Sequence, residues 1–274
     1  MGPSNPDLIT LSGVVVVILV NTLREHQTWA WMRLAQGPGA LKDTPGLIFA
    51  KVMGSGHEGG FGLRPSATHQ GLITVFDHAD QARAFLASPL TNTYRERAAE
   101  FWSGMLEVVS ARGQWDGQAW GTTPATQLGS HACAANDAEP PRPLAALTRA
   151  SIRPAKAMAF WRNAPAAQNA MQHAKGCSLA VGLGEAPLIR QCTFSVWDDT
   201  PSMLAYAHQG AHQAAIEAAY RHHYFSESMF VRMRLLEQQG QWPSPATQAA
   251  AQIANPPEDP QQGPAPALMP GPPP

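Results

Sequence analysis

The chain is short of charge and of cysteine, and both shortages narrow what it can be. Charged residues make up only 14% of its 274 residues, and 19 basic residues nearly balance 20 acidic ones. No basic block is present to attract a phosphate backbone, so we expect no nucleic-acid partner. The three cysteines, Cys133, Cys177 and Cys192, form no C-x-x-C pair, which argues against a zinc knuckle, an iron–sulfur cluster or a disulfide scaffold. A reducing, cytoplasmic compartment is the simplest prediction.

No targeting or membrane-spanning segment is predicted either. The run "LSGVVVVILV" at residues 11–20 is well short of the about 20 apolar residues that span a bilayer. No cationic segment precedes it and no small-residue cleavage site follows it. Four consecutive valines followed by Ile and Leu favour a buried strand. We therefore expect a soluble cytoplasmic protein, with peripheral contact with the inner membrane left open.

Two long segments show no sustained hydrophobic period. Residues 117–143 contain many polar, Pro and Gly residues and are predicted to be a linker. Residues 243–274 are rich in Pro, Ala and Gln and are predicted to be a disordered tail, because they cannot bury enough apolar surface to offset the entropy of ordering. Residues 1–10 are expected to be a flexible N-terminus.

The segments on either side of the linker, residues 11–116 and 144–242, repeat one pattern. "LITVFDHADQARAFLAS" and "QCTFSVWDDTPSMLAYAHQ" both pass from an alternating strand through Asp into a helix, and both halves later reach Gly-Gln-Trp. Upstream, each half has an apolar strand, a helix and a strand ending in Gly-x-Gly. The order β-α-β-β-α-β resembles the ferredoxin-like unit. We predict an α+β protein in which two fused ferredoxin-like repeats form a barrel of the dimeric α+β type. Asp77 and residues 198–200 are expected to cap helices.

Several kinds of chemistry lack their usual patterns. The Gly-rich turns "GSGHEGGF" and "GLGEAP" are neither a complete G-x-G-x-x-G nor a Walker loop. No serine nucleophile elbow and no convincing Cys–His pair is present. Nucleotide binding and acyl transfer are therefore unsupported.

Histidine is the most concentrated chemical feature. Residues 205–228 hold His208, His212, His222 and His223. His208 and His212 would share one face of a continuous helix, although Gly210 between them weakens that continuity. Three interpretations stay open: ordinary structural histidines, one histidine ligating a haem, or a multi-histidine metal site. A haem needs only one axial imidazole and a roomy apolar pocket, and aromatic residues are plentiful nearby.

In order and spacing, several stretches together resemble the spheroidene monooxygenase family, the acyclic carotenoid 2-ketolases of bacterial carotenoid biosynthesis. The resemblance runs from about residue 11 to residue 242, without the linker. The stretches that carry it are "KVMGSG", "WDG" at 115–117, "LAALTRASI", "FWRNAPA", "GLGEAPLIRQCTFSVWDD", "HQAAI" and "YFSESMFVRMRLL".

The resemblance implies a haem-dependent enzyme that uses O₂ and reduced ferredoxin. It would oxidise C2 of an acyclic, spheroidene-like carotenoid to a ketone through successive hydroxylations. A homodimer is compatible with this class. Tyr224 stands where the family usually has Trp, and this departure bears on the substrate more than on the reaction.

The resemblance also implies roles for individual residues. The histidine of the family's H-x-x-A-I stretch falls on His212, which we predict to be the proximal ligand of the haem iron, with His208 second. Lys51 would assist cofactor binding, and Arg149 and Gln191 would be catalytic. Arg149 could equally form a salt bridge at the end of its strand. Trp161, Trp197 and Phe225 would line the substrate pocket, with simple packing as the alternative. Glu227 could orient a histidine or pair with Arg232.

Two other functions remain alternatives. The first is a non-haem metal oxygenase that uses His208, His212 and one of His222 or His223. The second is a non-catalytic barrel that binds haem or lipid.

Overall fold

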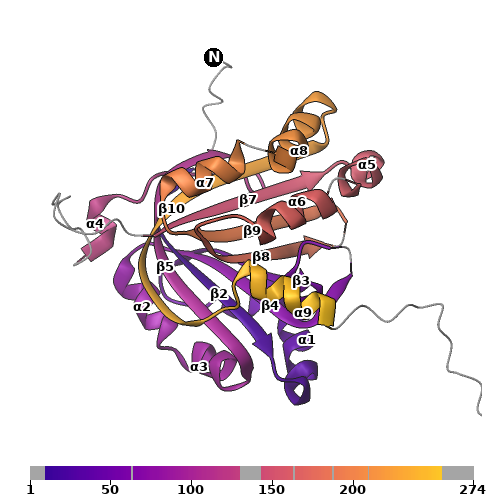
Figure 1. The fold of residues 1–274 in the computed structure, drawn as a ribbon. Helices are drawn as coiled ribbons and strands as arrows, with labels where there is room; N and C mark the ends of the chain where they lie inside the picture. Colours follow the sequence, from indigo (N-terminus) through magenta and orange to yellow (C-terminus); the bar gives the residue numbers. More distant parts are fainter. Residues whose placement is uncertain are drawn as a thin grey trace, which may run out of the picture.

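In the computed structural model, eight strands close into a barrel and the helices lie outside it (Figure 1). The structure describes residues 10–62, 64–129, 143–162, 164–186, 188–208 and 210–254. Around the barrel the strands run in the order β10-β5-β2-β4-β3-β8-β9-β7. The predicted α+β class is confirmed, as is the closed barrel.

The first half of the chain contributes four barrel strands and the helices beside them. Its elements are β1 (Thr10–Leu11), β2 (Val14–Thr22), η1 (Arg24–His26), α1 (Gln27–Gln36), η2 (Gly37–Leu41), β3 (Leu47–Gly56), η3 (His57–Gly59), β4 (Pro65–Phe76), α2 (Ala79–Leu86), α3 (Pro89–Glu96), β5 (Ala98–Gly113), β6 (Ala119–Trp120) and α4 (Ala125–Leu128).

The second half contributes the other four barrel strands, and a further helix follows them. Its elements are β7 (Leu144–Ile152), η5 (Pro154–Lys156), α5 (Ala157–Trp161), α6 (Ala164–Gln172), β8 (Cys177–Ala186), β9 (Arg190–Trp197), α7 (Thr200–Ala207), α8 (Gly210–Arg221), β10 (Phe225–Gln241) and α9 (Pro245–Ala254).

The order of the strands is the same in the two halves. The first half runs β5-β2-β4-β3 and the second runs β10-β7-β9-β8, so the barrel closes where β5 meets β10 and β3 meets β8. Gly54 and Gly184, from the two Gly-x-Gly stretches, pair directly across the β3–β8 seam. The glycines therefore lie within paired strands rather than in turns beyond the strand ends.

Strand β2 shows why the valine run is continuous. Val15, Val17 and Leu19 point into the barrel, whereas Val14, Val16, Ile18 and Val20 pack outside it, and none of these side chains is exposed. A strand that is buried on both faces has no polar positions to alternate with apolar ones. The prediction of a buried strand is confirmed.

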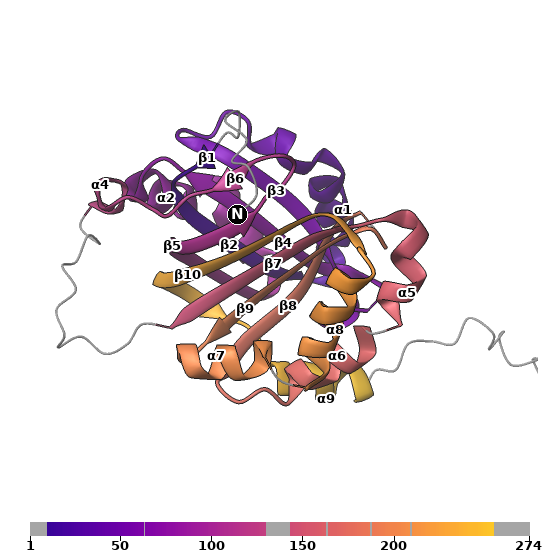
Figure 2. The same cartoon turned by 90° about the horizontal axis from the view of Figure 1, so that it is seen from above.

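Helices cover the outside of both halves (Figures 1 and 2). Helices α1, α2 and α3 lie along the first-half strands, and α5, α6, α7 and α8 lie on the outer side of the second-half strands. Among the described residues, no helix is long and apolar enough to cross a membrane.

Some local predictions need correction. His78, not Asp77, precedes α2, where its backbone N–H donates to Gln81. Asp199 caps α7 as predicted, because its carboxylate accepts from the Ser202 N–H at 2.7 Å. Helix α9 stands at the start of the segment predicted to be a disordered tail. Strand β6, inside the predicted linker, pairs with β1. Helix α4 also lies inside the predicted linker. Residues 130–142 and 255–274 of these segments, and residues 1–9, lie outside the described residues.

Candidate functional site

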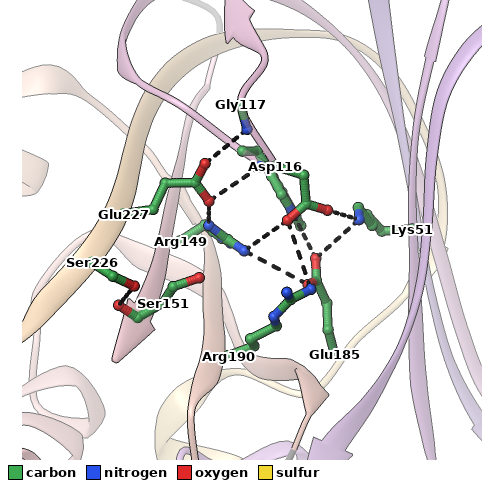
Figure 3. A network of polar contacts seen from close by, with 10 residues as sticks. Lys51, Asp116, Gly117, Arg149, Ser151, Glu185, Arg190, Ser226 and Glu227 are labelled. Atoms are coloured by element: carbon green, nitrogen blue, oxygen red, sulfur yellow. Dashed lines mark hydrogen bonds and ion pairs between the residues drawn. The ribbon is translucent and has the colours of Figure 1, made fainter. Parts of the chain in front are cut away.

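Six charged residues gather at the end of the barrel where β7 ends and β9 begins (Figure 3). We call them the charge cluster: Lys51, Asp116, Arg149, Glu185, Arg190 and Glu227. Lys51 and Asp116 come from the first half of the chain and the other four from the second. The cluster therefore ties the two halves together with three cations and three carboxylates.

Arg149 lies at the centre of the charge cluster. Only 1% of its side chain is exposed, and its guanidinium pairs with Glu227, with Asp116 at 3.2 Å and with Glu185 at 3.8 Å. The ring of Trp115 lies 5.6 Å from the guanidinium carbon. A buried cation needs such partners, because burying an isolated charge is costly. Of the interpretations of Arg149, the structure shows the salt bridge.

The "WDG" stretch forms a tight turn that reaches the cluster. Asp116 and Gly117 have φ values of +51° and +77°, as the two central residues of a type I′ turn require. Their backbone N–H groups donate to Glu227 at 3.1 and 2.8 Å. Glu227 thus holds this turn and Arg149 together, rather than pairing with Arg232 or orienting a histidine.

The electrostatics of the cluster favour fixed charges over proton transfer. Partial burial works against ionisation of Asp116, but its hydrogen bond to Lys51 and the charges of Lys51, Arg149 and Arg190 outweigh this and lower its pKa below the ordinary value. A carboxylate with a lowered pKa stays ionised near neutral pH. The charge cluster is thus suited to holding the barrel in shape.

A second feature lies on the opposite face of the same strands. In the first half, Ile18, Leu72 and Val52 form one row across the outer face of the sheet. The row at the matching place in the second half holds Thr148, Thr193 and Gly182. The two rows are matched through "LITVFD" at 72–77 and "TFSVWD" at 193–198. Small side chains thus replace bulky ones.

We call this surface the small-residue face. It comprises the small outward residues of β7, β8 and β9, namely Ala146, Thr148, Ala150, Ala180, Gly182, Gln191, Thr193 and Ser195, and it ends at the bulky pair Leu144 and Trp197 on the same face. Ile18 and Leu72 in the first half are at most 1% exposed, whereas Thr148, Thr193 and Gln191 are only half-buried. Met171 of α6 and Met203 of α7 pack with Ala180 and Trp197, so the helices cover this side in part and leave the strip at Thr148, Thr193 and Gln191 half-buried.

The histidines are distributed along a broken helix. Helix α7 ends before His208, which is exposed, and α8 begins at Gly210 with φ +61°. The expected continuous helix with His208 and His212 on one face is wrong, because the left-handed backbone at Gly210 interrupts it. The backbone of His212 lies in α8, which packs against α6 and α7. Its side chain lies outside the part that the structure describes.

The alternative of three histidines on one metal finds little support in the backbone. His208 precedes α8, and His222 and His223 follow it. A helix of 12 residues spans about 18 Å, so His208 is far from the other two. Among the described residues, no group of three or more His, Cys, Asp or Glu is placed to hold a metal ion.

The predicted aromatic residues fall into two groups. Trp161 and Phe225 both lie near Phe160, whose ring is 5.4 Å from that of Trp161 and 5.8 Å from that of Phe225. Trp197 is 1% exposed and packs against Tyr206 at 5.4 Å. Phe225 is half-buried and accessible to a ligand. Trp197 is buried and packs against its neighbours.

The structure thus divides the predicted site residues between the two sides of one sheet. Lys51 and Arg149 point toward the charge cluster. Gln191 lies on the small-residue face, one residue from the inward-facing Cys192 that pairs with Arg149. Side chains of adjacent strand residues point to opposite faces, so Arg149 and Gln191 do not meet.

Sequence reasoning missed Asp116, Glu185 and Arg190. They come from segments far apart in the chain, and no local spacing links them. The available signals were the Asp-Gly pair of "WDG" and the two charges, Glu185 and Arg190, that flank the β8–β9 turn.

Comparison with known proteins gives close relatives. No family model matches the chain. Spheroidene monooxygenase of Rubrivivax gelatinosus is 46% identical over 239 residues, which cover 86% of this chain and 88% of the relative. Spheroidene monooxygenase of Rhodobacter capsulatus is 34% identical and covers 78% of this chain and 86% of its own length. The enzyme of that name from Cereibacter sphaeroides is 31% identical, with 89% and 72% covered.

Solved structures support the fold. A crystal structure of aldoxime dehydratase matches with a TM-score of 0.52 at 9% identity, covering 85% of this chain and 88% of its own. At that identity the likeness concerns the fold alone. The sequence relatives show more: the chain belongs to the spheroidene monooxygenase family and is an oxidoreductase.

Proposed function

We propose that this protein is a haem-dependent monooxygenase that oxidises C2 of an acyclic, spheroidene-like carotenoid. Two successive hydroxylations at C2 give a gem-diol, which loses water to leave a ketone. Reduced ferredoxin and O₂ are the co-substrates. The family membership supports the choice of a carotenoid as substrate. The small-residue face is the structural observation that supports haem as the cofactor.

The residues of the second half fit a haem in two respects. A flat macrocycle needs a sheet face without bulky side chains. Thr148 and Thr193 are small and half-buried there, whereas Gly182 lies beneath the Gly60 carbonyl and the Phe61 side chain, so the part of the face that can receive a ligand lies over β7 and β9. A haem also needs one imidazole, and α8 carries His212 on the same side of the barrel.

A bound haem would supply the redox chemistry with O₂, and the chain supplies the surroundings. We assign His212 as the proximal ligand, with His208 second. Gln191 offers an amide on the small-residue face, where the structure shows no hydrogen-bond partner for it among the described residues. Trp161 and Phe225 orient the apolar end of the substrate and exclude water.

Lys51 and Arg149, first predicted to serve cofactor and catalysis directly, take an indirect role in this proposal. Both are held by carboxylates of the charge cluster. Arg149 fixes β7, whose next residue, Ala150, belongs to the small-residue face. The charge cluster thus positions the sheet on which the cofactor lies.

The proposal extends to the architecture and the setting of the protein. The equal strand order of the halves supports two fused ferredoxin-like repeats. A cytoplasmic protein with peripheral contact with the inner membrane suits a substrate that dissolves in lipid. Assembly as a homodimer is part of the same proposal.

The reaction is tested with purified protein, an acyclic carotenoid, reduced ferredoxin and ¹⁸O₂. We expect a 2-keto carotenoid that carries ¹⁸O, because both hydroxyl oxygens of the gem-diol come from O₂. A product without ¹⁸O, whose oxygen is instead labelled in a parallel experiment with H₂¹⁸O and unlabelled O₂, would contradict the proposal. So would the absence of any oxidised product. Omission of ferredoxin is the control for the electron donor.

A further inference from the structure

The segment after β7 and the β8–β9 turn together carry exposed apolar side chains and exposed cations. Met158 in α5 is 74% exposed and Leu188, in the β8–β9 turn, is 46% exposed. Arg153, Lys156 and Arg162 surround Met158 in the sequence and are all exposed. Isolated exposed apolar residues are ordinary, but a group bordered by charge of one sign marks an interaction surface.

Among the described residues, no carboxylate pairs with these cations. The sequence has no Asp or Glu between Glu139 and Glu185. Within the described ranges, Arg153, Lys156 and Arg162 form no ion pair. The carboxylates at this end of the barrel, Asp116, Glu185 and Glu227, are already engaged by the charge cluster. The surface is therefore positively charged.

The two apolar side chains are carried by elements that are fixed to each other. The Trp161 indole N–H donates to the Leu188 carbonyl at 2.9 Å, and the Ile152 N–H donates to the Ile189 carbonyl at 2.7 Å. Leu188 has φ +69°, a conformation that favours glycine or asparagine and is strained for a leucine. The turn therefore holds the exposed Leu188 in a fixed position beside α5.

We propose that α5 and the β8–β9 turn form a membrane-docking surface that seats this end of the barrel on an anionic phospholipid bilayer. Met158 and Leu188 insert at the boundary between headgroups and acyl chains, and Arg153, Lys156 and Arg162 contact the phosphates. An acidic protein would match the cations but would not account for the two exposed apolar side chains. Figure 2 shows α5 at the periphery of the molecule, free to meet a surface.

The docking surface adjoins the aromatic group of the candidate site. Phe160 follows Met158 by two residues, and its ring lies 5.8 Å from that of Phe225. A polyene that leaves the bilayer at Met158 would meet Phe160 and Phe225 before the small-residue face. The docking proposal depends only on the residues of this surface. The delivery of a carotenoid from the bilayer to the candidate site depends also on the proposed function.

Vesicle flotation of the full chain tests the docking. We expect the protein to float with vesicles of equal parts phosphatidylcholine and phosphatidylglycerol, and to be released by salt. Lys156→Ala lowers the partition coefficient about fivefold, as expected for the loss of one cation at the surface, and Met158→Ser lowers it about tenfold. The matched controls Lys42→Ala and Val109→Ser, at exposed positions just after η2 and on β5, leave it unchanged.

Flotation that is absent, or equal for wild type and the two variants, would overturn the proposal. So would binding of an acidic protein by the same surface without any binding to vesicles. Turnover separates the docking from the reaction. Met158→Ser should lose turnover of carotenoid embedded in vesicles and keep turnover of carotenoid dispersed in detergent. If wild type floats but oxidises neither form, the proposed reaction fails and the docking stands.

Discussion

The structural role of Arg149 depends on partners that are distant in the sequence. Its neighbours Thr148 and Ala150 face the helices, while its own guanidinium is buried against carboxylates from β8, β10 and the turn at Asp116. The sequence singles out Arg149 and Lys51, since both lie on strands in family-like stretches. It could not reveal their partners, because the barrel closure that brings them together is not a local property of the chain.

Replacing Arg149 with Met should destabilise the protein by about 3 kcal/mol, because three carboxylates lose their central cation while partly buried. Arg190→Met is the matched control: Arg190 is 46% exposed, and its loss should cost at most about 1 kcal/mol. Urea unfolding of both variants measures the difference. Equal losses would show that the buried guanidinium is not the centre of the cluster.

His69 should make the stability of the barrel depend on pH. It is 5% exposed, and burial, together with the charge of His57, lowers its pKa from 6.5 to about 4. The unfolded chain takes up a proton near pH 6.5, whereas folded His69 resists protonation until about pH 4. The free energy of unfolding should therefore fall on acidification across this window, by about 3 kcal/mol at about 1.4 kcal/mol for each pKa unit.

The variant His69→Gln isolates this contribution. The slope of unfolding free energy against pH, measured by urea titration between pH 7 and about pH 4, should become flatter in the variant. His173→Gln removes an exposed imidazole and serves as the matched control. An unchanged slope in His69→Gln would mean that His69 is not buried as a neutral residue.

At the scale of elements, the two sheets differ in what their outer faces carry. Leu72 in β4 is 1% exposed beneath the helices of the first half, and Thr193 is half-buried at the matching place in β9. If the small-residue face exists for a ligand, then bulk there should harm binding without harming folding.

Thr193→Leu should leave the free energy of unfolding within about 0.5 kcal/mol of wild type and abolish haem binding, measured by equilibrium titration with haem. The reciprocal variant Leu72→Thr should cost about 2 kcal/mol through lost packing and a buried hydroxyl while leaving haem affinity of the folded protein unchanged. Haem binding that survives in Thr193→Leu would place the cofactor elsewhere.

The elements that could be predicted from sequence are those with strong local signals. The valine run gave β2, and Asp199 with Pro201 gave the start of α7. Helix α9 was missed because its Ala and Gln residues resemble a disordered segment, whereas Gln248 is 8% exposed in the structure. The break before α8 was underestimated, since Gly210 takes a left-handed conformation that composition alone does not reveal.

At the scale of the whole molecule, internal repetition was the most informative signal. The matched stretches at 72–77 and 193–198 led to the α+β barrel, and both fall at equivalent places in the strand order. Repetition also hides the difference between the halves. The two halves share one pattern of strands and helices, but the side chains on the outer faces of their sheets pack differently. The small-residue face emerges only when cross-strand rows are compared.

The most direct test of the account is the visible absorption spectrum of protein produced with ample haem, for wild type, His212→Ala and the matched control His208→Ala. We expect a Soret band in wild type that collapses in His212→Ala and persists in His208→Ala. A band that survives His212→Ala would keep the haem and move its ligand. A protein that binds metal without a Soret band, or shows neither metal nor band, would contradict the central claim that this barrel is a haem enzyme.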